Sequence, residues 1–351
     1  MKPTDLEVYL NEKSKVLGFS HSGAAPLSRP LSFDVYQNWL QEGHHGEMKY
    51  LATHAPIKEH PQQKWPKARS ALIFAAPYVP HPHPPQDFPL RETRISLYAQ
   101  GYDYHHWFKT KLQELCNELK ELFPEEEFIA MTDSSPVLER DLAYRAGLGW
   151  IGKNSCIIHP KHGSLFFLGE IYSSLSLTLS KTPVHDFCGT CRRCVEVCPT
   201  QALSSAKTLD ARKCISYLTI ESRQLPPEEL REKMGDWLFG CDLCQTVCPW
   251  NQKVFKNQLS FAPLESKTPE QENSLEEELR WILTSSGKQL EKALFGTALS
   301  RAGGFGLKRN ALIVTANRRC SRLRPEVEAL RSHPKLGELA EWALKKLSDT
   351  P

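Results

Sequence analysis

Apolar residues in the first half of the chain recur at helical spacing in three segments. The longest stripe advances by four, three, four and three residues, through Phe108, Leu112, Leu115, Leu119 and Leu122. This spacing puts five apolar side chains on one face, which is typical of a helix packed against a sheet. The segments Leu6 to Leu17, closed by Gly18, and Phe33 to Leu40 show the same period. We therefore predict three helices here.

Three short apolar runs among these helices predict strands. They are Ala71 to Tyr78, Phe128 to Met131 and Leu165 to Tyr172. Short apolar runs bounded by turn residues suit buried strands. Strands that alternate with helices predict an α/β sandwich that extends to about residue 180.

The C-terminal part of the chain changes to a helical pattern. Ser274-x-x-Glu277 has the form of a capping box ahead of Leu279, Ile282 and Leu283. Further helices are expected at 288–295, 308–317, 325–332 and 335–347. Short consecutive helices resemble stacked hairpins of the HEAT kind, although a helical lid on the core is an alternative. The fold class is therefore α+β.

Eight of the eleven cysteines lie between residues 188 and 248, in two spaced groups. The first reads Cys188-x-x-Cys191-x-x-Cys194-x-x-x-Cys198-Pro199, and the second reads Cys241-x-x-Cys244-x-x-x-Cys248-Pro249. Three cysteines at two-residue gaps can wrap one cubane, and a fourth before a proline binds the other. The second group lacks one cysteine, which Cys214 restores. The expected ligand sets are Cys188, Cys191, Cys194 and Cys248 for one [4Fe–4S] cluster, and Cys198, Cys214, Cys241 and Cys244 for the other.

Two other uses of these cysteines fit less well. Structural zinc usually takes two C-x-x-C pairs for each metal, which differs from a run of three followed by Cys-Pro. Disulfides need an oxidising compartment. The N-terminus, MKPTDLEVYL, has no apolar signal segment, and the chain has no run of about 18 apolar residues that could span a membrane. We therefore expect a cytoplasmic protein with reduced thiols and no membrane partner.

The overall charge does not indicate a partner. The chain has 44 basic and 41 acidic residues, for a net charge of +3. This balance is too even to indicate nucleic acid by itself, so any basic surface must be local. At 351 residues the chain can hold two or three domains. We place them at 1–180, 181–255 and 256–351.

Polar, glycine-rich segments outside the cysteine groups are candidates for a ligand site. They are Ile95 to His106, Thr132 to Arg140 and Gly147 to Asn154, with His159 to Ser164 after them. Asp133 follows a predicted strand and precedes a Ser-Ser-Pro helix start. A carboxylate at the end of a strand faces the crevice where ligands bind in α/β folds. A helix N-cap is the alternative role for this aspartate.

Together these motifs resemble the epoxyqueuosine reductase family. The resemblance rests on TDSSPVLER, GLGWIGKN, FFLGEIY, CGTCRRCVEVCPTQAL, CISYLTIE and MGDWLFGCDLCQTVCPWN. It covers residues 5–255 closely, and RAGGFGLKRNALIVTANRR is similar to the HEAT-like end of the family. FFLGEIY and the cysteine segments also resemble the related reductive dehalogenases.

The resemblance implies a cobalamin in the N-terminal domain and two [4Fe–4S] clusters, in a ferredoxin-like domain, that reduce it. The substrate would be epoxyqueuosine at the wobble position of tRNA, and the epoxide oxygen would leave as water, giving queuosine. Asp133 matches the active-site acid of the family. To donate a proton near pH 7, its pKa would have to rise above about 3.9, which burial under a corrin would favour.

The match also implies contacts to the cofactor and the substrate. Residues expected near the corrin are Lys58, Tyr98, Gly101, Asp103, Asn154, His159 and Ser216. Local basic clusters predict tRNA contacts at Lys308, Arg309, Arg318 and Arg319, because such residues neutralise phosphates. An external electron donor and a monomeric chain complete the expectation.

Two other functions remain open at this stage. One is a corrinoid iron–sulfur reductase of a small molecule such as an organohalide. The missing export signal and the basic C-terminal helices favour tRNA over that substrate. The other is a ferredoxin-like electron carrier fused to an inert domain. It would need neither a corrin nor Asp133, and the series of polar motifs argues against it.

Overall fold

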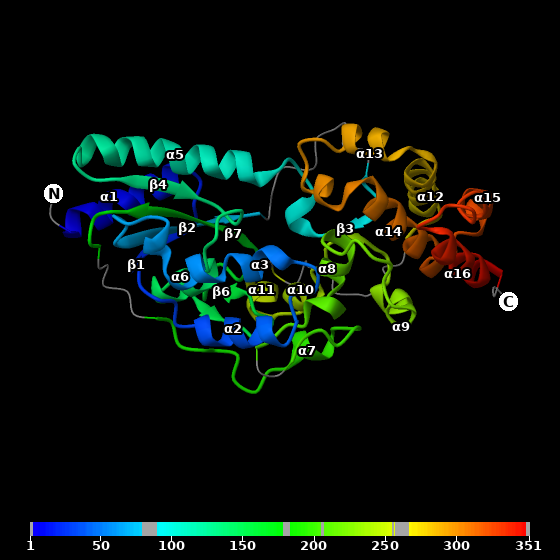
Figure 1. The fold of residues 1–351 in the computed structure, drawn as a ribbon, viewed down its shortest axis with the longest axis horizontal. Helices are drawn as coiled ribbons and strands as arrows, with labels where there is room; N and C mark the ends of the chain where they lie inside the picture. Colours follow the sequence, from blue (N-terminus) through cyan, green and yellow to red (C-terminus); the bar gives the residue numbers. More distant parts are fainter. Residues whose placement is uncertain are drawn as a thin grey trace.

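The computed structural model describes residues 3–78, 90–177, 183–204, 207–254, 256 and 267–348. Figure 1 shows a sheet with its helices at one end of the molecule and the helices of the C-terminal region at the other. The short helices α8 and α10 of the cysteine-rich segment lie between these two ends. In the part of the chain that is described, no helix is long and apolar enough to cross a membrane.

A four-stranded sheet forms the N-terminal part. Its strand order is β1 (His21–Pro26), β2 (Ser70–Pro77), β7 (Phe166–Ser173) and β4 (Phe128–Met131). All three pairings are antiparallel. The predicted strands β2, β4 and β7 are confirmed. Because the sheet is antiparallel, the rule for strand ends in doubly wound folds does not apply to Asp133, although this residue does follow β4 and line a cavity.

Strand β1 was not predicted, because its six residues HSGAAP carry little strand signal. The small residues at its centre serve close packing. A Cβ atom on Gly23 would lie 2.4 Å from the carbonyl oxygen of Ala146. The strand thus forms because helix α6 (Glu139–Arg145) and its following turn pack directly on it, and tertiary packing outweighs local propensity.

Helices cover both faces of the sheet. On one face, α1 (Pro3–Val16) and α5 (Tyr104–Leu122) pack against β2 and β7. Phe108, Leu112, Leu115 and Leu119 are fully buried there, and Leu122 is exposed. On the other face, α6 packs against the inner strands. The shorter helices α2 (Phe33–Gln41), α3 (Lys49–Thr53) and α4 (Ala55–Glu59) follow β1 in the chain.

The cysteine-rich segment consists of short elements. They are α7 (Arg193–Glu196), α8 (Ile215–Ile220), α9 (Glu228–Arg231), β8 (Trp237–Phe239), α10 (Leu243–Thr246) and α11 (Pro249–Val254). Strand β8 pairs in parallel with β3 (Arg94–Ile95), which ties this segment to the N-terminal part. A two-stranded ribbon, β5 (Trp150–Ile151) with β6 (Ile157–Ile158), precedes it.

Five further α-helices follow in the described part of the chain. They are α12 (Pro269–Thr284), α13 (Gly287–Ala293), α14 (Gly303–Asn317), α15 (Arg324–Glu328) and α16 (Gly337–Ser348). The predicted capping box at Ser274 is wrong: the box is formed by Thr268 and Gln271, and Ser274 lies inside α12. Pro269 at the first helical position fixes this earlier start.

One hydrophobic core joins the C-terminal helices to the cysteine-rich segment. At its centre Arg309 of α14 is fully buried. Its guanidinium donates to the carbonyl oxygens of Leu218, Ser222 and Gln224, at 2.5, 2.6 and 3.0 Å. Burial is the main cause that lowers its pKa, to about 10. Arg309 thus links α14 to the segment 218–224 and is not accessible to tRNA. The prediction that it contacts tRNA is wrong.

Replacing Arg309 with methionine is expected to destabilise the protein. The change leaves three buried carbonyl groups without their donor, and the loss of one partner in such a network costs about 3–5 kcal/mol. Denaturant unfolding of the Arg309→Met variant measures this cost. The neighbouring, partly exposed Lys308 supplies the control, because Lys308→Met should change stability by less than about 0.5 kcal/mol. Equal stability of the two variants would contradict the buried role.

Candidate functional site

A cavity of about 1760 Å³ lies where the sheet, the cysteine-rich segment and the C-terminal helices meet. Its walls include side chains from α2 to α4, from the start of α5, from the turn before α6 and from α8. Its lining includes the following polar and aromatic residues: Tyr50, Lys58, Tyr98, Asp103, Tyr104, His105, Asp133, Glu139, Cys214, Ser216, Glu221 and Arg301. Pockets for small ligands reach about 1,000 Å³, so this cavity can take a bulkier group.

Asp133 sits in the cavity wall, in the turn that follows β4. A helix was predicted to start directly after Asp133. The structure instead has a turn there, and α6 starts only at Glu139. The Nε2 atom of His105 lies 2.6 Å from Oδ1 of Asp133, and the Tyr104 hydroxyl donates to its Oδ2. On its other side, Nδ1 of His105 lies 2.5 Å from Oδ1 of Asp103. Asp103 also caps α5 by accepting the backbone N–H of His105, so the helix start fixes this set.

The protonation of Asp133 depends on its neighbours. Burial would raise its pKa, but hydrogen bonds from His105 and Tyr104 and the charge of His105 outweigh it and hold the pKa below 3.8. The carboxylate side chain is also 40% exposed. The expected rise of this pKa depends on a corrin lying over Asp133, so for the cofactor-bound protein it stays a prediction. The hydrogen bond to Asp133 is the main cause that raises the pKa of His105, to about 9, so the pair is ionic at neutral pH.

Two further carboxyl groups, the partly buried Glu139 and the buried Glu170, interact electrostatically with Asp133, and neither was given a role from the sequence. Burial, followed by the charge of Asp133, raises the pKa of Glu139 to about 8. Glu170 of β7 is fully buried, and burial likewise raises its pKa. Both Glu170 side-chain oxygens lack hydrogen-bond partners among the described residues. One signal could have found it: Glu170 is the single charged residue in the apolar strand FFLGEIYS.

Four of the residues predicted near the corrin line the cavity: Lys58, Tyr98, Asp103 and Ser216. Lys58 is buried, and its Nζ donates to the carbonyl oxygen of Val137 at 3.0 Å, which anchors the turn that carries Asp133. Burial is the main cause that lowers its pKa, to about 8.

The cavity lining does not include the other three, Gly101, Asn154 and His159. Asn154 instead borders a cysteine-lined cavity and donates to the carbonyl oxygen of Cys244 at 3.3 Å. The His159 ring packs on the rings of His21 and His162, at centroid distances of 4.3 and 4.6 Å. These three residues lie in or beside polar, glycine-rich segments, and this position in the sequence did not predict whether they line the cavity.

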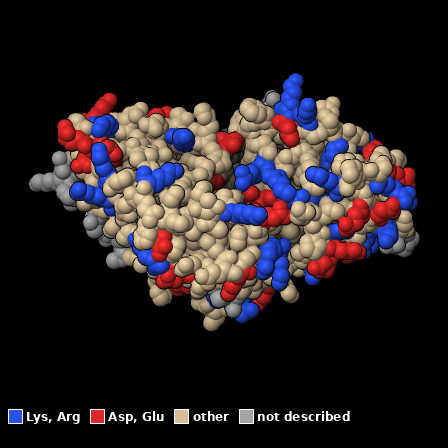
Figure 2. All heavy atoms as spheres, viewed as in Figure 1, with Lys and Arg blue, Asp and Glu red and all other residues tan. Residues whose placement is uncertain are grey.

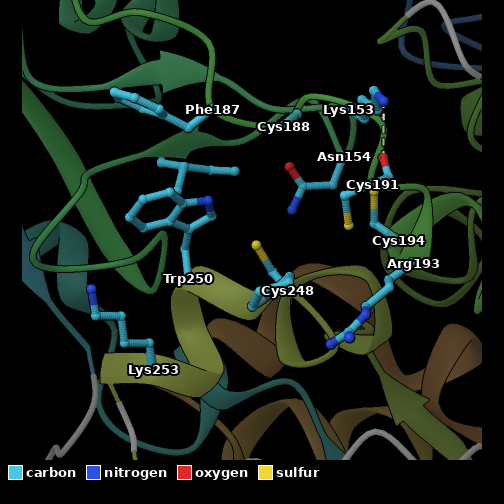
Figure 3. A pocket seen from close by; sticks show the side chains of 12 residues that line it. Lys153, Asn154, Phe187, Cys188, Cys191, Arg193, Cys194, Cys248, Trp250 and Lys253 are labelled. Carbon is cyan, nitrogen blue, oxygen red and sulfur yellow. Dashed lines mark hydrogen bonds between the residues drawn. The ribbon is translucent and has the colours of Figure 1, made fainter.

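A second, smaller cavity of about 290 Å³ is lined by Cys188, Cys191, Cys194 and Cys248. These four are the predicted ligands of one cluster. Figure 3 shows the sulfur atoms of Cys191, Cys194 and Cys248 turned toward the same space. Trp150 donates its indole N–H to Sγ of Cys188 at 3.4 Å. Four thiols around one small cavity are the donor set that a cubane requires.

The other predicted set is also brought together. Burial is the main cause that raises the pKa of the Cys241 and Cys244 thiols, and the charges of Cys214 and Cys198 raise both further. As thiolates, these four side chains would all be negative and would repel one another. Bound iron ions would supply the compensating positive charge. Cys214 also lines the large cavity, so this cluster site adjoins it.

The remaining predicted tRNA contacts are placed unevenly. Arg318 is largely buried, within 3.5 Å of Asp236 and paired with Glu272, so its predicted role is wrong. Arg319 is exposed and Lys308 is partly exposed, and both stay candidates. The cavity rim holds a better-placed cation. Arg301 makes a bidentate pair with Glu221, both bonds at 2.9 Å, and more than half of its side chain is exposed.

Known proteins share these features. Residues 187–251 match a family described as "4Fe-4S double cluster binding domain", and residues 58–134 match "Epoxyqueuosine reductase QueG, DUF1730". The epoxyqueuosine reductase of Pseudomonas aeruginosa strain PAO1 is 35% identical, over 99% of this chain and 96% of its own.

Solved structures agree with this relationship. A crystal structure of epoxyqueuosine reductase with an epoxyqueuosine-modified tRNA-Tyr stem loop is 27% identical, with a TM-score of 0.81 over 99% of this chain and 92% of that one. The enzyme of Bacillus subtilis, with an aspartate-bearing catalytic loop swung out of its active site, is 26% identical, with a TM-score of 0.79 over 99% and 91%. The chain belongs to the epoxyqueuosine reductase family.

Proposed function

We propose that this protein reduces epoxyqueuosine in tRNA to queuosine, with loss of the epoxide oxygen as water. One observation carries the proposal. The large cavity holds the acid–base set of Asp133 and His105, and it also contains Cys214, a predicted ligand of the second cluster. A proton source and an electron source thus meet in one cavity. An electron carrier alone would need no such set.

The cavity fits a corrin as its further cofactor. Its volume exceeds what a small substrate needs, and aromatic rings from Tyr36, Trp39, Tyr98 and Tyr104 line it together with polar groups. Tyr98, Lys58, Asp103 and Ser216 would hold the cobalamin. When bound, cobalamin supplies a cobalt centre that cycles between Co(II) and Co(I) and accepts electrons one at a time.

Side chains of the protein hold and transfer the proton that the departing epoxide oxygen needs. Asp133 lies at the cavity wall, and His105 holds a proton 2.6 Å from its carboxylate. As the epoxide oxygen departs, it needs a proton. Asp133 can pass one on, and His105 can restore it. Tyr104 fixes the carboxylate through its hydroxyl and stacks on Phe167 at 3.8 Å. A catalytic aspartate loop in the Bacillus subtilis relative supports placing this role in the turn after β4.

The C-terminal part closes the cavity and offers a surface for tRNA. Figure 2 shows a hollow between two lobes, with Lys and Arg side chains gathered along it. Arg301 and Tyr50 line the cavity, and the guanidinium of Arg301 lies 6.0 Å from the centre of the tyrosine ring. A flipped wobble base can stack on such groups. We propose that α12–α16 form a HEAT-like region that contacts the stem, with Lys308 and Arg319 as phosphate contacts.

Reconstitution tests the proposed function directly. The protein is loaded under anaerobic conditions with iron, sulfide and cobalamin, then mixed with reductant and tRNA that carries epoxyqueuosine. We expect about eight irons and one cobalt per chain, and queuosine in the digested tRNA. Eight irons without retained cobalt would favour the electron-carrier function. Retained cobalt without queuosine would favour a small-molecule substrate.

Turnover is expected to fall as the pH rises through about 8 to 9. The pKa values of Glu139 (about 8) and His105 (about 9) both lie above their ordinary values, so both groups hold their proton at pH 7 and lose it in this range. The His105 ion pair also stabilises the fold fully below about pH 6.5, and this contribution disappears as the pH rises through about 9. Single-turnover rates from pH 6 to 10 measure the effect on catalysis. His105→Gln should remove the part of the fall near pH 9 and leave the part near pH 8 that Glu139 sets, and an unchanged profile would contradict the role of His105.

A further inference from the structure

The cavity of the first cluster opens beside two aromatic rings. The side chain of Phe187 is 50% exposed, and its ring lies 5.7 Å from that of Trp250. Trp250 in turn packs edge-on against Trp150, at 5.0 Å, and Trp150 bonds to the Cys188 sulfur. Figure 3 shows both rings on one side of the cysteines. Phe187 and Trp250 together give this side of the cavity a small apolar surface.

Basic side chains border the same cavity. Lys153, Arg193 and Lys253 line it, and Arg193 and Lys253 are exposed. Lys153 is held in place by the carbonyl oxygens of Gly189 and Cys191, at 2.6 and 2.9 Å. Two acidic groups are near in the chain. Asp186 is neutralised by Lys207 at 2.7 Å, and Glu196 lies 3.8 Å from Arg192. The surface is therefore positive around an apolar centre.

The two cluster sites differ in their position relative to the large cavity. The second site adjoins it through Cys214, whereas the lining of the first cavity shares no cysteine with it. With the second cluster next to the large cavity, the first cluster is the expected entry point for electrons. The charged, half-apolar surface lies at that entry.

We propose that Phe187, Trp250, Lys153, Arg193 and Lys253 form a docking face for a small acidic one-electron carrier protein of the flavodoxin class. This inference rests on the proposed function, which supplies the need for electrons. In each encounter the hydroquinone of the carrier gives one electron to the oxidised first cluster and becomes a semiquinone. Two encounters supply the two electrons of one turnover.

The charges on this face set the expected behaviour. A basic face and an acidic carrier attract one another, which speeds association at low salt and has little effect at high salt. A redox partner needs only a small, short-lived interface, which typically buries less than about 1,200 Å² of surface. The half-exposed Phe187 and the partly buried Trp250 give the apolar centre of such a contact.

Stopped-flow reduction of the reconstituted, oxidised protein tests the docking face. Reduced flavodoxin is mixed with the protein, and the bleaching of the clusters is followed in the absence of tRNA. The variant Arg193→Glu/Lys253→Glu is compared with Lys288→Glu/Lys345→Glu, which makes the same charge change at exposed positions of α13 and α16. We expect the first to lower the second-order rate about tenfold or more at low salt and to flatten its salt dependence, while the second leaves it within about twofold.

Two further measurements separate docking from damage to the cluster. Reduced methyl viologen, a small cation, should reduce both variants as fast as the parent protein. The single variant Lys253→Glu, five residues beyond the nearest ligand, should show the same selective loss if the double variant binds less iron. Equal flavodoxin rates for the parent and the charge-reversed protein would overturn the proposal, as would an equal loss in the control. Competition by excess tRNA would assign the face to nucleic acid instead. A parent protein without clusters would overturn the proposed function itself.

Discussion

Replacing Asp133 with asparagine is expected to abolish most turnover while leaving the cofactors in place. The change removes the carboxylate that lies 2.6 Å from His105, and general acid–base groups contribute about 10²- to 10⁴-fold. Asparagine keeps the shape and can still accept the Tyr104 hydroxyl, so the turn should keep its position. Single-turnover formation of queuosine under saturating reductant measures the loss.

The matched control for this variant is Asp34→Asn. Asp34 is an exposed aspartate whose partner is Arg29 on the surface, so its loss should not change the rate. Iron and cobalt contents should equal those of the parent protein in both variants. If Asp133→Asn kept full turnover, the proton would have to come from another group, and Glu139 would be the first candidate.

Replacing Cys214 with alanine is expected to remove one cluster and all turnover. Cys214 lies between the two spaced cysteine groups in the sequence, and in the structure it faces both its predicted partners and the large cavity. Without it, the second cubane has three protein ligands. Iron analysis should fall from about eight to about four irons per chain, and the remaining cluster should still bleach with reductant.

Cys116→Ala is the control for the loss of a thiol. Cys116 is buried in the core on α5, away from both cysteine sets, and its replacement should keep all eight irons. An unchanged iron content in Cys214→Ala would show that another residue, such as the partly buried Cys156, completes the second site.

Much of this arrangement could be predicted because its signals are local. The spacing of the cysteines is a property of a few turns of chain, and the period of Phe108 to Leu119 follows from burial on one helix face. What could not be predicted depends on contacts between distant segments. Strand β1 exists because α6 packs on its small residues. The pKa of Asp133 is raised by burial but lowered further by hydrogen bonds from Tyr104 and from His105, which lies 28 positions away.

Charge was the least reliable guide to position. Arg309 and Arg318 belong to one basic stretch that predicted a nucleic-acid surface, yet both point into the protein. A sequence shows how many charges a helix carries, but the packing of its neighbours decides which of them meet solvent. In contrast, Arg301 stands alone in the sequence and lies at the cavity rim.

The buried hydrogen bonds of Arg309 have a consequence for the genetics of this protein. The carbonyl groups that it holds belong to the segment 218–224, which follows Cys214 and carries Glu221 of the cavity wall. A genetic screen for cells whose tRNA lacks queuosine would therefore recover missense alleles in α14, far from the reacting atoms. Such alleles should be temperature-sensitive. Second substitutions that stabilise α14 should suppress them.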